Sequence, residues 1–172
     1  MEHEPRIAVY PGTFDPMTNG HLSLIRRACT IFDRIVVGVA NDTAKIPLFT
    51  IEERVAMAQE VLAGQDNVEV QSFSGLTVDF ADHLGASVIV RGLRAVSDFE
   101  YEFQLALINR KMKRHIQTVF LMTDYQWFYI SSTVIRAAAK IGGDIRELVP
   151  APIYYRLREK FGYPYPLAEK QG

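Results

Sequence analysis

The sequence predicts an α/β fold: a doubly wound parallel sheet of five strands, flanked by helices and followed by a C-terminal helical segment. Short runs rich in Val, Ile or Phe alternate with amphipathic stretches, which is the pattern of βαβ units. The chain has 172 residues, 48% of them hydrophobic, enough to bury a core without disulfides or metal. We find no repeat and no low-complexity tract, and we expect residues 1–172 to form one domain.

Five segments have the composition of buried strands, because each is short and rich in β-branched or aromatic residues. They span residues 6–10, 34–40, 67–73, 87–91 and 117–122. In an open parallel sheet, ligands bind outside the carboxyl ends of the strands. Functional residues are therefore expected in the loops that follow these segments.

Helices are expected between the strands. One face of the helix expected over residues 21–32 carries Leu22, Ile25, Cys29 and Phe32. This spacing places Cys29 in the core. Thr50 and Glu53 have the spacing of a capping box, which predicts that a second helix begins there. Its expected buried stripe consists of Ile51, Val55, Ala58 and Leu62.

A second capping-box pair, Ser97 and Glu100, predicts a helix from there to about residue 114. This helix carries two apolar stripes, more than one packing face needs. They are Tyr101, Leu105, Ile108 and Met112, and Phe99, Phe103 and Ala106. Either one stripe faces a partner subunit or both are buried within the chain. A further short helix is expected near residues 154–160.

The charge balance argues against several classes of protein. The chain has 19 Lys and Arg residues against 20 Asp and Glu, a net charge of −1, whereas a broad nucleic-acid surface needs a marked positive excess. The longest apolar runs fall far short of the ~20 residues of a membrane-spanning helix. A single cysteine and an N-terminus without the pattern of an export signal lead us to expect a cytoplasmic protein.

A Gly-containing loop follows the first predicted strand and leads into a helix that begins near His21. Residues 10–21 contain the end of the strand, the loop and the start of the helix. Unpaired backbone N–H groups and the helix dipole make such a helix start a ready anion site. His21 adds a hydrogen-bond donor there, and the dipole favours its neutral imidazole. The alternative is that His21 simply caps the helix.

Polar residues suited to phosphate also follow the second and fourth strands. Lys45 follows the second, with a solvated surface lysine as the alternative. Arg91 and Arg94 follow the fourth, where each guanidinium can grip a phosphate with two N–H groups. The alternative for this pair is salt bridges to Asp98 and Glu102.

Three hydroxyls, Ser131, Ser132 and Thr133, begin the helix after the fifth strand. Hydroxyls at such positions are also ordinary N-caps. Four separate polar segments are nevertheless expected to meet at one edge of one sheet. This convergence favours a phosphate-binding site over four unrelated surface features.

Two of these segments resemble a known superfamily. Residues 11–16 with Thr18-Asn19-Gly20-His21 resemble the nucleotidyltransferase version of the His-x-Gly-His motif, and residues 130–136 resemble its Ile-Ser-Ser-Thr-x-x-Arg element. The twelve residues 91–102 resemble one family specifically, the bacterial phosphopantetheine adenylyltransferases. The likeness extends from about residue 7 to residue 148.

The resemblance implies a Rossmann-like nucleotidyltransferase domain that acts in coenzyme A biosynthesis. Such an enzyme transfers the adenylyl group of ATP to 4'-phosphopantetheine and releases pyrophosphate. Dephospho-coenzyme A is the implied product, and coenzyme A is a candidate further ligand. The resemblance also implies Mg²⁺ as cofactor and a homohexamer built as a dimer of trimers.

No cluster of Asp, Glu and His has the spacing of metal ligands. We therefore expect no metal site in the protein, and Mg²⁺ carried mainly by the phosphates of ATP and by water. Asp15 is the nearest carboxylate to the expected site, and stabilisation of a turn is the alternative role for it.

The positions that match the motifs of the resembled family imply a role for each site residue. Thr13 would touch both substrates, and Lys45, Thr77 and Arg91 would hold phosphopantetheine. His21 matches the residue that stabilises the transition state. The nucleotide would lie against Thr13, Phe14, His21, Gly92, Leu93, Arg94, Glu102, Trp127, Phe128, Tyr129, Ile130, Ser131, Ser132 and Thr133. The chain departs from the family's usual residues at Ile46, Thr77 and 124–126.

The chemistry needs no general base. The second pKa of a phosphate monoester is about 6, so the acceptor is already nucleophilic at neutral pH. We expect a direct in-line displacement without a covalent intermediate, driven by positioning and positive charge. The expected catalytic residues are Thr13 and Lys45, which align the substrates, His21, which donates to the transition state, and Arg91, which holds the acceptor phosphate.

Three alternatives compete with this interpretation. The first is the same chemistry with nicotinamide mononucleotide, glycerol phosphate or phosphocholine as acceptor. The second is a module that binds ATP without transferring anything, although such a module needs no grip on an acceptor phosphate. The third is a fragment resembling a class I tRNA synthetase, for which the chain has no room and no positive charge.

Overall fold

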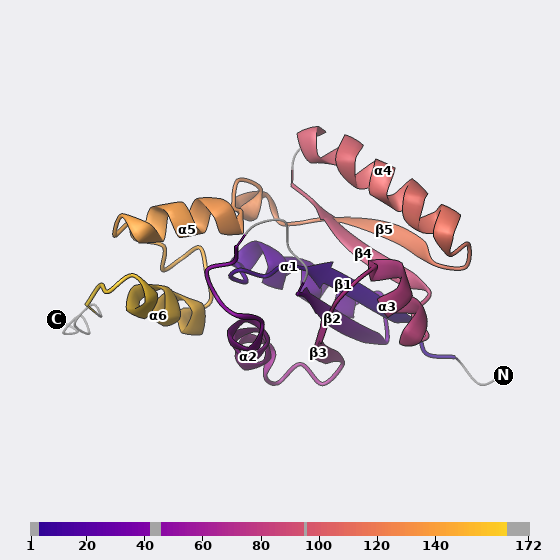
Figure 1. The fold of residues 1–172 in the computed structure, drawn as a ribbon, viewed down its shortest axis with the longest axis horizontal. Coiled ribbons are helices and arrows are strands. Elements are labelled where there is room, and N and C mark those ends of the chain that lie inside the picture. The colour runs from indigo at the N-terminus through magenta and orange to yellow at the C-terminus, as the bar shows by residue number, and fades with distance from the viewer. Residues whose placement is uncertain (1–3, 42–45, 95, 165–172) are drawn as a thin grey trace.

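Five parallel strands form one sheet through the middle of the molecule (Figure 1). The structure is a computed structural model that describes residues 4–41, 46–94 and 96–164, with only the backbone of residues 96–98. The strands are β1 (Ile7–Gly12), β2 (Arg34–Ala40), β3 (Val68–Phe73), β4 (Val88–Leu93) and β5 (Gln117–Met122). Their order is β3-β2-β1-β4-β5, the arrangement of a doubly wound sheet, so the predicted fold class is confirmed.

Helices connect and follow the strands. They are α1 (Asn19–Cys29), α2 (Ile51–Leu62), α3 (Thr77–His83), α4 (Val96–Met112), α5 (Ser132–Lys140) and α6 (Ala151–Lys160), with a short 3₁₀ helix η1 (Tyr125–Trp127). In the ranges that the structure describes, no helix combines the length and the apolar character needed to span a bilayer.

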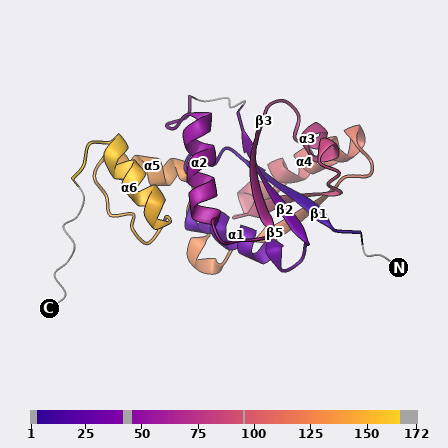
Figure 2. The same cartoon turned by 90° about the horizontal axis from the view of Figure 1, so that it is seen from below.

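The side chains of β1 alternate between two hydrophobic layers. Ala8 and Tyr10 pack against α1 and α2, in a core that also holds Ile25 and Ala58. Val9 points to the opposite face, where it packs with Val78 of α3. Figure 2 shows the sheet edge-on between these helices. Because both faces are covered, the strands are nearly continuous hydrophobic runs, as parallel strands usually are.

A third core joins the C-terminal helices to the rest of the chain. Ile135 of α5 and Ile153 and Leu157 of α6 belong to this cluster. They pack with Phe49, which precedes α2, and with Met57 in the middle of α2. This cluster anchors α5 beside the sheet, so that the start of α5 lies near the end of β1 (Figure 1).

The two capping boxes predicted from the sequence have different outcomes. Thr50 and Glu53 form the predicted reciprocal hydrogen bonds at the start of α2. The predicted start at Ser97 is wrong, because α4 already begins at Val96 and Ser97 lies inside it. The sequence did not indicate α3, which is short and buries only Val78 and Ala81.

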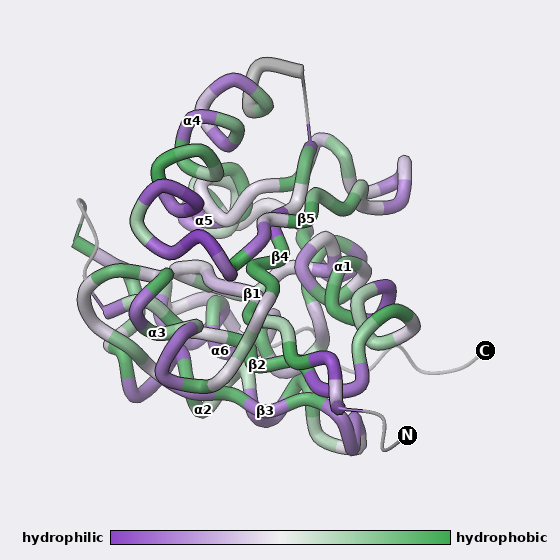
Figure 3. Tube along the Cα trace, turned by 90° about the vertical axis from the view of Figure 1, so that its right-hand side faces the viewer, coloured by the Kyte–Doolittle hydropathy of each residue, from purple (hydrophilic) through white to green (hydrophobic). Residues whose placement is uncertain are grey.

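The α4 helix is poorly covered by the rest of the chain. Phe120 of β5 contacts Phe99, but the predicted alternative of deep burial for both apolar stripes is wrong. The exposed side chains along α4 include Phe99, Tyr101, Phe103, Leu107, Ile108 and Met112. Figure 3 shows α4 at one edge of the molecule, with hydrophobic positions among hydrophilic ones.

Candidate active site

A cavity of about 530 Å³ lies where β1 and β4 end. These two strands are neighbours in the sheet. After β1 the chain adds β2 and β3 on one side, and after β4 it adds β5 on the other side. The cavity therefore occupies the topological switch point of the sheet. Its volume is within the range of small-molecule sites. The cavity is therefore the candidate active site of the described residues.

Most of the expected site residues line this cavity. They are Thr13, Phe14, His21, Arg91, Gly92, Arg94, Glu102, Trp127, Ile130, Ser131, Ser132 and Thr133. The four polar segments separated in the sequence thus contribute as expected, except that Lys45 lies outside the described residues.

Four expected residues are not among the residues that line the cavity. Leu93, Phe128 and Tyr129 stand next to lining residues, and Tyr129 is 70% exposed. Thr77 begins α3, beyond β3 at the far edge of the sheet. A ligand would have to extend beyond the cavity to reach any of the four.

The loop after β1 is held in an unusual shape by its own aromatic ring. Phe14 has a φ of 47°, in the left-handed region that non-glycine residues rarely adopt. Its ring folds back over Gly12, where an added Cβ would lie 2.9 Å from the ring. Gly12 is needed at this position because no side chain fits under Phe14. The ring also contacts His21 edge-on, with 5.1 Å between the centroids.

His21 both caps α1 and faces the cavity. Its Nδ1 atom accepts a hydrogen bond from the backbone N–H of Thr18, with 3.0 Å between the two nitrogens. The Thr18 hydroxyl in turn accepts a hydrogen bond from the His21 backbone N–H. The cap and the ligand donor, which were alternatives in the sequence, are therefore compatible, because Nδ1 serves the cap and Nε2 keeps the proton.

Burial shifts the pKa values of two rings that line the cavity, His21 and Tyr10, so that both favour the neutral form. Desolvation, with a smaller effect of the positive charge of Arg94, lowers the pKa of His21 to about 4. Burial raises the pKa of the Tyr10 phenol above its usual value, although Arg91 and Arg94 oppose this shift. Both side chains are uncharged at neutral pH and can act only through neutral hydrogen bonds.

Arg91 is held by a carboxylate. Its Nε and Nη2 atoms donate to the two Glu102 oxygens, each at 2.6 Å, and Nη1 donates to the carbonyl of Pro11 at 3.2 Å. The salt-bridge alternative is thus realised for Arg91 and Glu102. A guanidinium has five N–H groups, so two remain for a ligand while Glu102 fixes the plane of the group.

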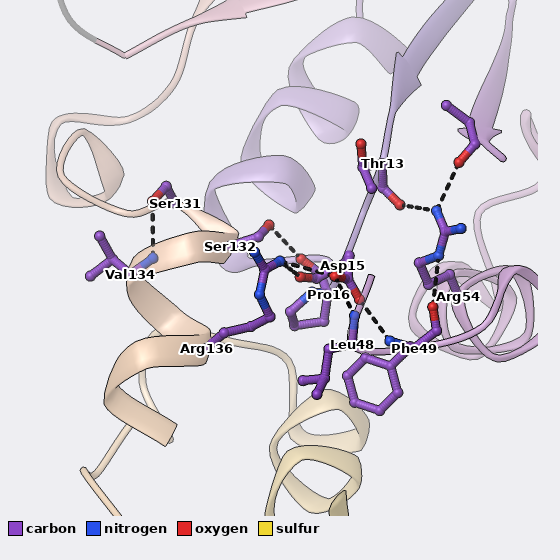
Figure 4. Close-up of polar contacts among 11 residues, drawn as sticks. Thr13, Asp15, Pro16, Leu48, Phe49, Arg54, Ser131, Ser132, Val134 and Arg136 are labelled. Carbon is purple, nitrogen blue, oxygen red and sulfur yellow. Dashed lines mark hydrogen bonds and ion pairs between the residues drawn. The ribbon is translucent and has the colours of Figure 1, made fainter. Parts of the chain in front are cut away.

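The hydroxyls at the start of α5 also have structural partners. Ser131 caps the helix by accepting the backbone N–H of Val134, and Ser132 donates to the Pro16 carbonyl at 2.8 Å (Figure 4). The N-cap alternative therefore holds for Ser131. Ser132 and Thr133, which begin α5, line the cavity, and their backbone N–H groups have no partner within the helix.

Asp15 is buried and fully engaged. Its carboxylate accepts the backbone N–H groups of Leu48 and Phe49, at 2.8 and 3.0 Å, and pairs with Arg136 at 3.0 Å (Figure 4). Arg136 also donates to the Asp15 carbonyl. Asp15 therefore ties two distant segments to the first loop, a longer-range role than the expected stabilisation of a local turn.

The structure contains no obvious protein site for Mg²⁺. Among the described residues, no group of three or more His, Cys, Asp or Glu side chains is arranged to hold a metal ion. The nearest candidate, Asp15, already has three donors. The Asp15 carboxylate is therefore already committed to protein contacts.

Segment 124–126, which departs from the family's usual residues, is fixed to α1. The carboxylate of Asp124 accepts the Ser23 hydroxyl at 2.8 Å and pairs with Arg27 at 2.5 Å. Immediately beyond it, Trp127 packs over Gly20 at the start of α1 and lines the cavity. Asp124 therefore helps to place Trp127 in the wall of the cavity, although residues 124–126 do not line the cavity themselves.

The cavity combines features that suit a polyphosphate. The N-termini of α1 and α5 both reach it, and each contributes a positive dipole end. The N–H groups of Ser132 and Thr133 at the start of α5 have no intrahelical partner, whereas in α1 only Gly20 keeps such a group, because Asn19 and His21 donate to Leu148 and Thr18. Arg91 and Arg94 add positive charge, and the side chain of Arg94 also reaches the Ile130 carbonyl at 3.4 Å. The Thr18 hydroxyl lies 3.0 Å from His21 Nδ1, but Thr18 is buried and its hydroxyl accepts the His21 backbone N–H at the start of α1.

Comparison with known proteins gives one consistent result. The cytidylyltransferase-like family matches residues 9–138. A protein of Oleidesulfovibrio alaskensis is 74% identical over 162 residues, which cover 94% of this chain and 95% of that protein. A protein of Moorella thermoacetica is 54% identical over 158 residues, covering 92% and 99%. Both relatives carry the name phosphopantetheine adenylyltransferase.

A solved structure from Vibrio parahaemolyticus has the same fold. It is described as a candidate nicotinate-nucleotide adenylyltransferase, and it superposes with a TM-score of 0.68 over 90% of this chain and 99% of its own. The sequence identity is only 19%, so this likeness concerns the fold alone.

Proposed function

Since the chain belongs to the phosphopantetheine adenylyltransferase family, we propose that its cavity transfers the adenylyl group of ATP to 4'-phosphopantetheine. The products are dephospho-coenzyme A and pyrophosphate, in a step of coenzyme A biosynthesis. One observation carries the assignment of this reaction to the cavity. Two helix N-termini, His21 and two arginines surround a single space at the switch point of the sheet.

The reaction is a direct in-line displacement without a covalent intermediate. The acceptor phosphate already carries its nucleophilic charge at neutral pH, so the site has to bring two polyanions together and stabilise charge at the α-phosphate. Backbone N–H groups and fixed positive side chains can do this without rearranging during the reaction.

His21 donates through Nε2 to the charge that develops on the α-phosphate. Its Nδ1 atom is occupied by the Thr18 N–H, so the neutral ring is locked in the tautomer with the proton on Nε2. The hydrogen bond from this neutral donor becomes stronger as negative charge develops on the α-phosphate, so it stabilises the transition state more than the ground state. Thr13 and Lys45 align the two substrates beside it.

Arg91 holds the acceptor phosphate with the N–H groups that Glu102 and Pro11 leave free. Arg94 and the first turn of α5 hold the β- and γ-phosphates of the leaving pyrophosphate. Mg²⁺, bound to these phosphates, supplies further charge neutralisation.

We also propose a homohexamer built as a dimer of trimers. The support on this chain is the exposed apolar surface of α4, which is larger than the scattered apolar residues of an ordinary monomer surface. We propose the cytoplasm as the compartment, since the single cysteine suits a reducing environment.

The function is tested by pyrophosphate release from the purified chain with Mg²⁺ and ATP. The acceptors are phosphopantetheine, nicotinamide mononucleotide, glycerol phosphate, phosphocholine and none. We expect release with phosphopantetheine alone, together with dephospho-coenzyme A identified by mass. Release with another acceptor would overturn the substrate assignment. Binding of ATP without release would indicate a binding module.

A further inference from the structure

Arg54 is a charged side chain in the hydrophobic layer between α2 and the sheet. It is 1% exposed, the largest side chain that the fold buries completely. Such burial is costly for a guanidinium unless its N–H groups are satisfied, and desolvation lowers its pKa while Asp15 opposes that shift. The position on α2 itself needs only an apolar residue, like Met57 and Ala58 nearby. The charge therefore serves something other than the packing of α2.

The contacts of Arg54 are backbone carbonyls from three segments. Nη1 donates to the carbonyls of Thr13 and Ala40, both at 2.8 Å, and Nε donates to the carbonyl of Phe49 at 3.1 Å (Figure 4). Thr13 lies in the loop after β1, Ala40 ends β2, and Phe49 precedes α2. One side chain thus fixes the separation of three chain segments at the edge of the cavity.

Asp15 connects the same loop to the chain before α2, as an acceptor where Arg54 is a donor. Its carboxylate accepts the N–H groups of Leu48 and Phe49. Arg54 and Asp15 together tie the loop that carries Thr13 to the chain on both sides of residues 42–45. Ala40 lies before that stretch, and Leu48 and Phe49 lie after it.

We propose that Arg54 is a positioning residue for the acceptor side of the site. It sets the backbone of Thr13 relative to Ala40 and to residues 46–49, of which Ile46 and Pro47 line the cavity. The inference rests on the proposed function, because it assigns Arg54 to the alignment of phosphopantetheine with ATP. Arg54 is not among the residues that line the cavity, so it acts through these backbone groups alone. The nucleotide side depends less on it, because α1, α5 and Arg94 hold that side independently.

The test compares Arg54→Met, Arg54→Lys and the unrelated core variant Ile116→Ala. Ile116 is buried on the other face of the sheet, so its truncation lowers stability without touching the cavity. For each variant we measure the melting temperature, the dissociation constant of ATP, and kcat and KM for phosphopantetheine well below melting.

We expect Arg54→Met to lose about 10²-fold in kcat/KM for phosphopantetheine, the cost of a misplacement of roughly 1 Å. The ATP dissociation constant should change by less than about threefold. Arg54→Lys keeps the charge but cannot span all three carbonyls, so it should recover part of the loss. Ile116→Ala should show wild-type kinetics despite its lower melting temperature.

Several results would overturn the inference. Wild-type kinetics in Arg54→Met would do so, as would an equal loss of ATP binding and acceptor turnover. Kinetic losses in Ile116→Ala that match those of the Arg54 variants would mean that stability alone is responsible. If neither Arg54 variant folds, Arg54 is a structural residue only. If the wild-type chain makes no dephospho-coenzyme A, the proposed function fails first, and the inference falls with it.

Discussion

The Nδ1 atom of His21 accepts the backbone N–H of Thr18 at 3.0 Å, and this contact decides which nitrogen of the ring can serve a ligand. A backbone amide always donates, so Nδ1 must be unprotonated and the neutral ring carries its proton on Nε2. His21, in the first turn of α1, therefore takes part in the helix cap and also presents a fixed donor to the cavity.

Substitutions at His21 should separate these two roles. His21→Ala removes both, so turnover should fall by about 10²–10³, and the free energy of unfolding should fall by about 0.5–1 kcal/mol. His21→Gln places the usual capping-box acceptor at the same helix position and keeps an amide N–H donor, so it should recover the stability and part of the activity. Steady-state kinetics and urea denaturation check this. Turnover of His21→Ala within a few-fold of wild type would exclude the donor role.

The low pKa of His21 predicts a pH-dependent contribution to stability. The folded-state pKa is about 4 and the usual value is 6.5, so between them the unfolded chain binds more protons at this residue than the folded chain. Its contribution is complete above about pH 6.5 and is lost as the pH falls toward about 4. From about pH 7.5 to about pH 5, wild type should therefore lose more stability than His21→Gln. Equal losses would mean that the ring titrates normally.

The pairing of Arg91 with Glu102 should couple the two residues energetically. Glu102→Gln keeps the shape but removes the charge, so KM for phosphopantetheine should rise by about tenfold as Arg91 loses its orientation. A double-mutant cycle with Arg91→Met should give a coupling energy of about 1–2 kcal/mol in unfolding experiments. Additive effects of the two substitutions would show that the contact contributes nothing.

The exposed face of α4 should hold the assembly together. Light scattering of the wild-type chain should give about six times the chain mass of 19.5 kDa. Leu107→Glu places a charge on the apolar surface and should shift the mass to smaller species. Gln104→Glu adds the same charge at an exposed polar position of the same helix and serves as the control. A monomeric wild type at micromolar concentration would contradict the proposed hexamer.

Binding of Mg²⁺ should depend on the nucleotide. Titration calorimetry with Mg²⁺ alone should show no binding, because the described residues offer no cluster of three ligands and Asp15 is engaged. Mg²⁺ should bind when ATP is present, and chelation should abolish turnover reversibly. Tight binding without ATP would reveal a protein site.

The alternation of strands and helices was predictable because buried parallel strands have a strong local signature. β2 and β5 begin and end at the predicted residues, whereas β1 and β4 each extend two residues further. These extensions contain Gly12 and Gly92, which local composition does not favour in strands. Pairing with neighbours extends them, as Gly12 pairs with Val39 and Gly92 with Leu121.

The cavity was predictable for a geometric reason, since loops after parallel strands meet at one edge. The supporting contacts were not predictable. In the sequence, Arg54 looks like an ordinary charge on a helix surface, and Asp15 is indicated only as a carboxylate near the site or in a local turn. The carbonyls that Arg54 binds lie 5, 14 and 41 residues away. The groups that bind the Asp15 carboxylate lie 33 to 121 residues away. Only the fold brings these groups together, and no local pattern encodes such distances.

The stereochemistry at the α-phosphorus tests the central claim most directly. ATP with a chiral α-thiophosphate is incubated with phosphopantetheine, and the configuration of the resulting dephospho-coenzyme A analogue is determined. A single in-line transfer within this cavity predicts complete inversion. Retention would require two successive displacements through a covalent adenylyl-enzyme and would contradict the proposed mechanism.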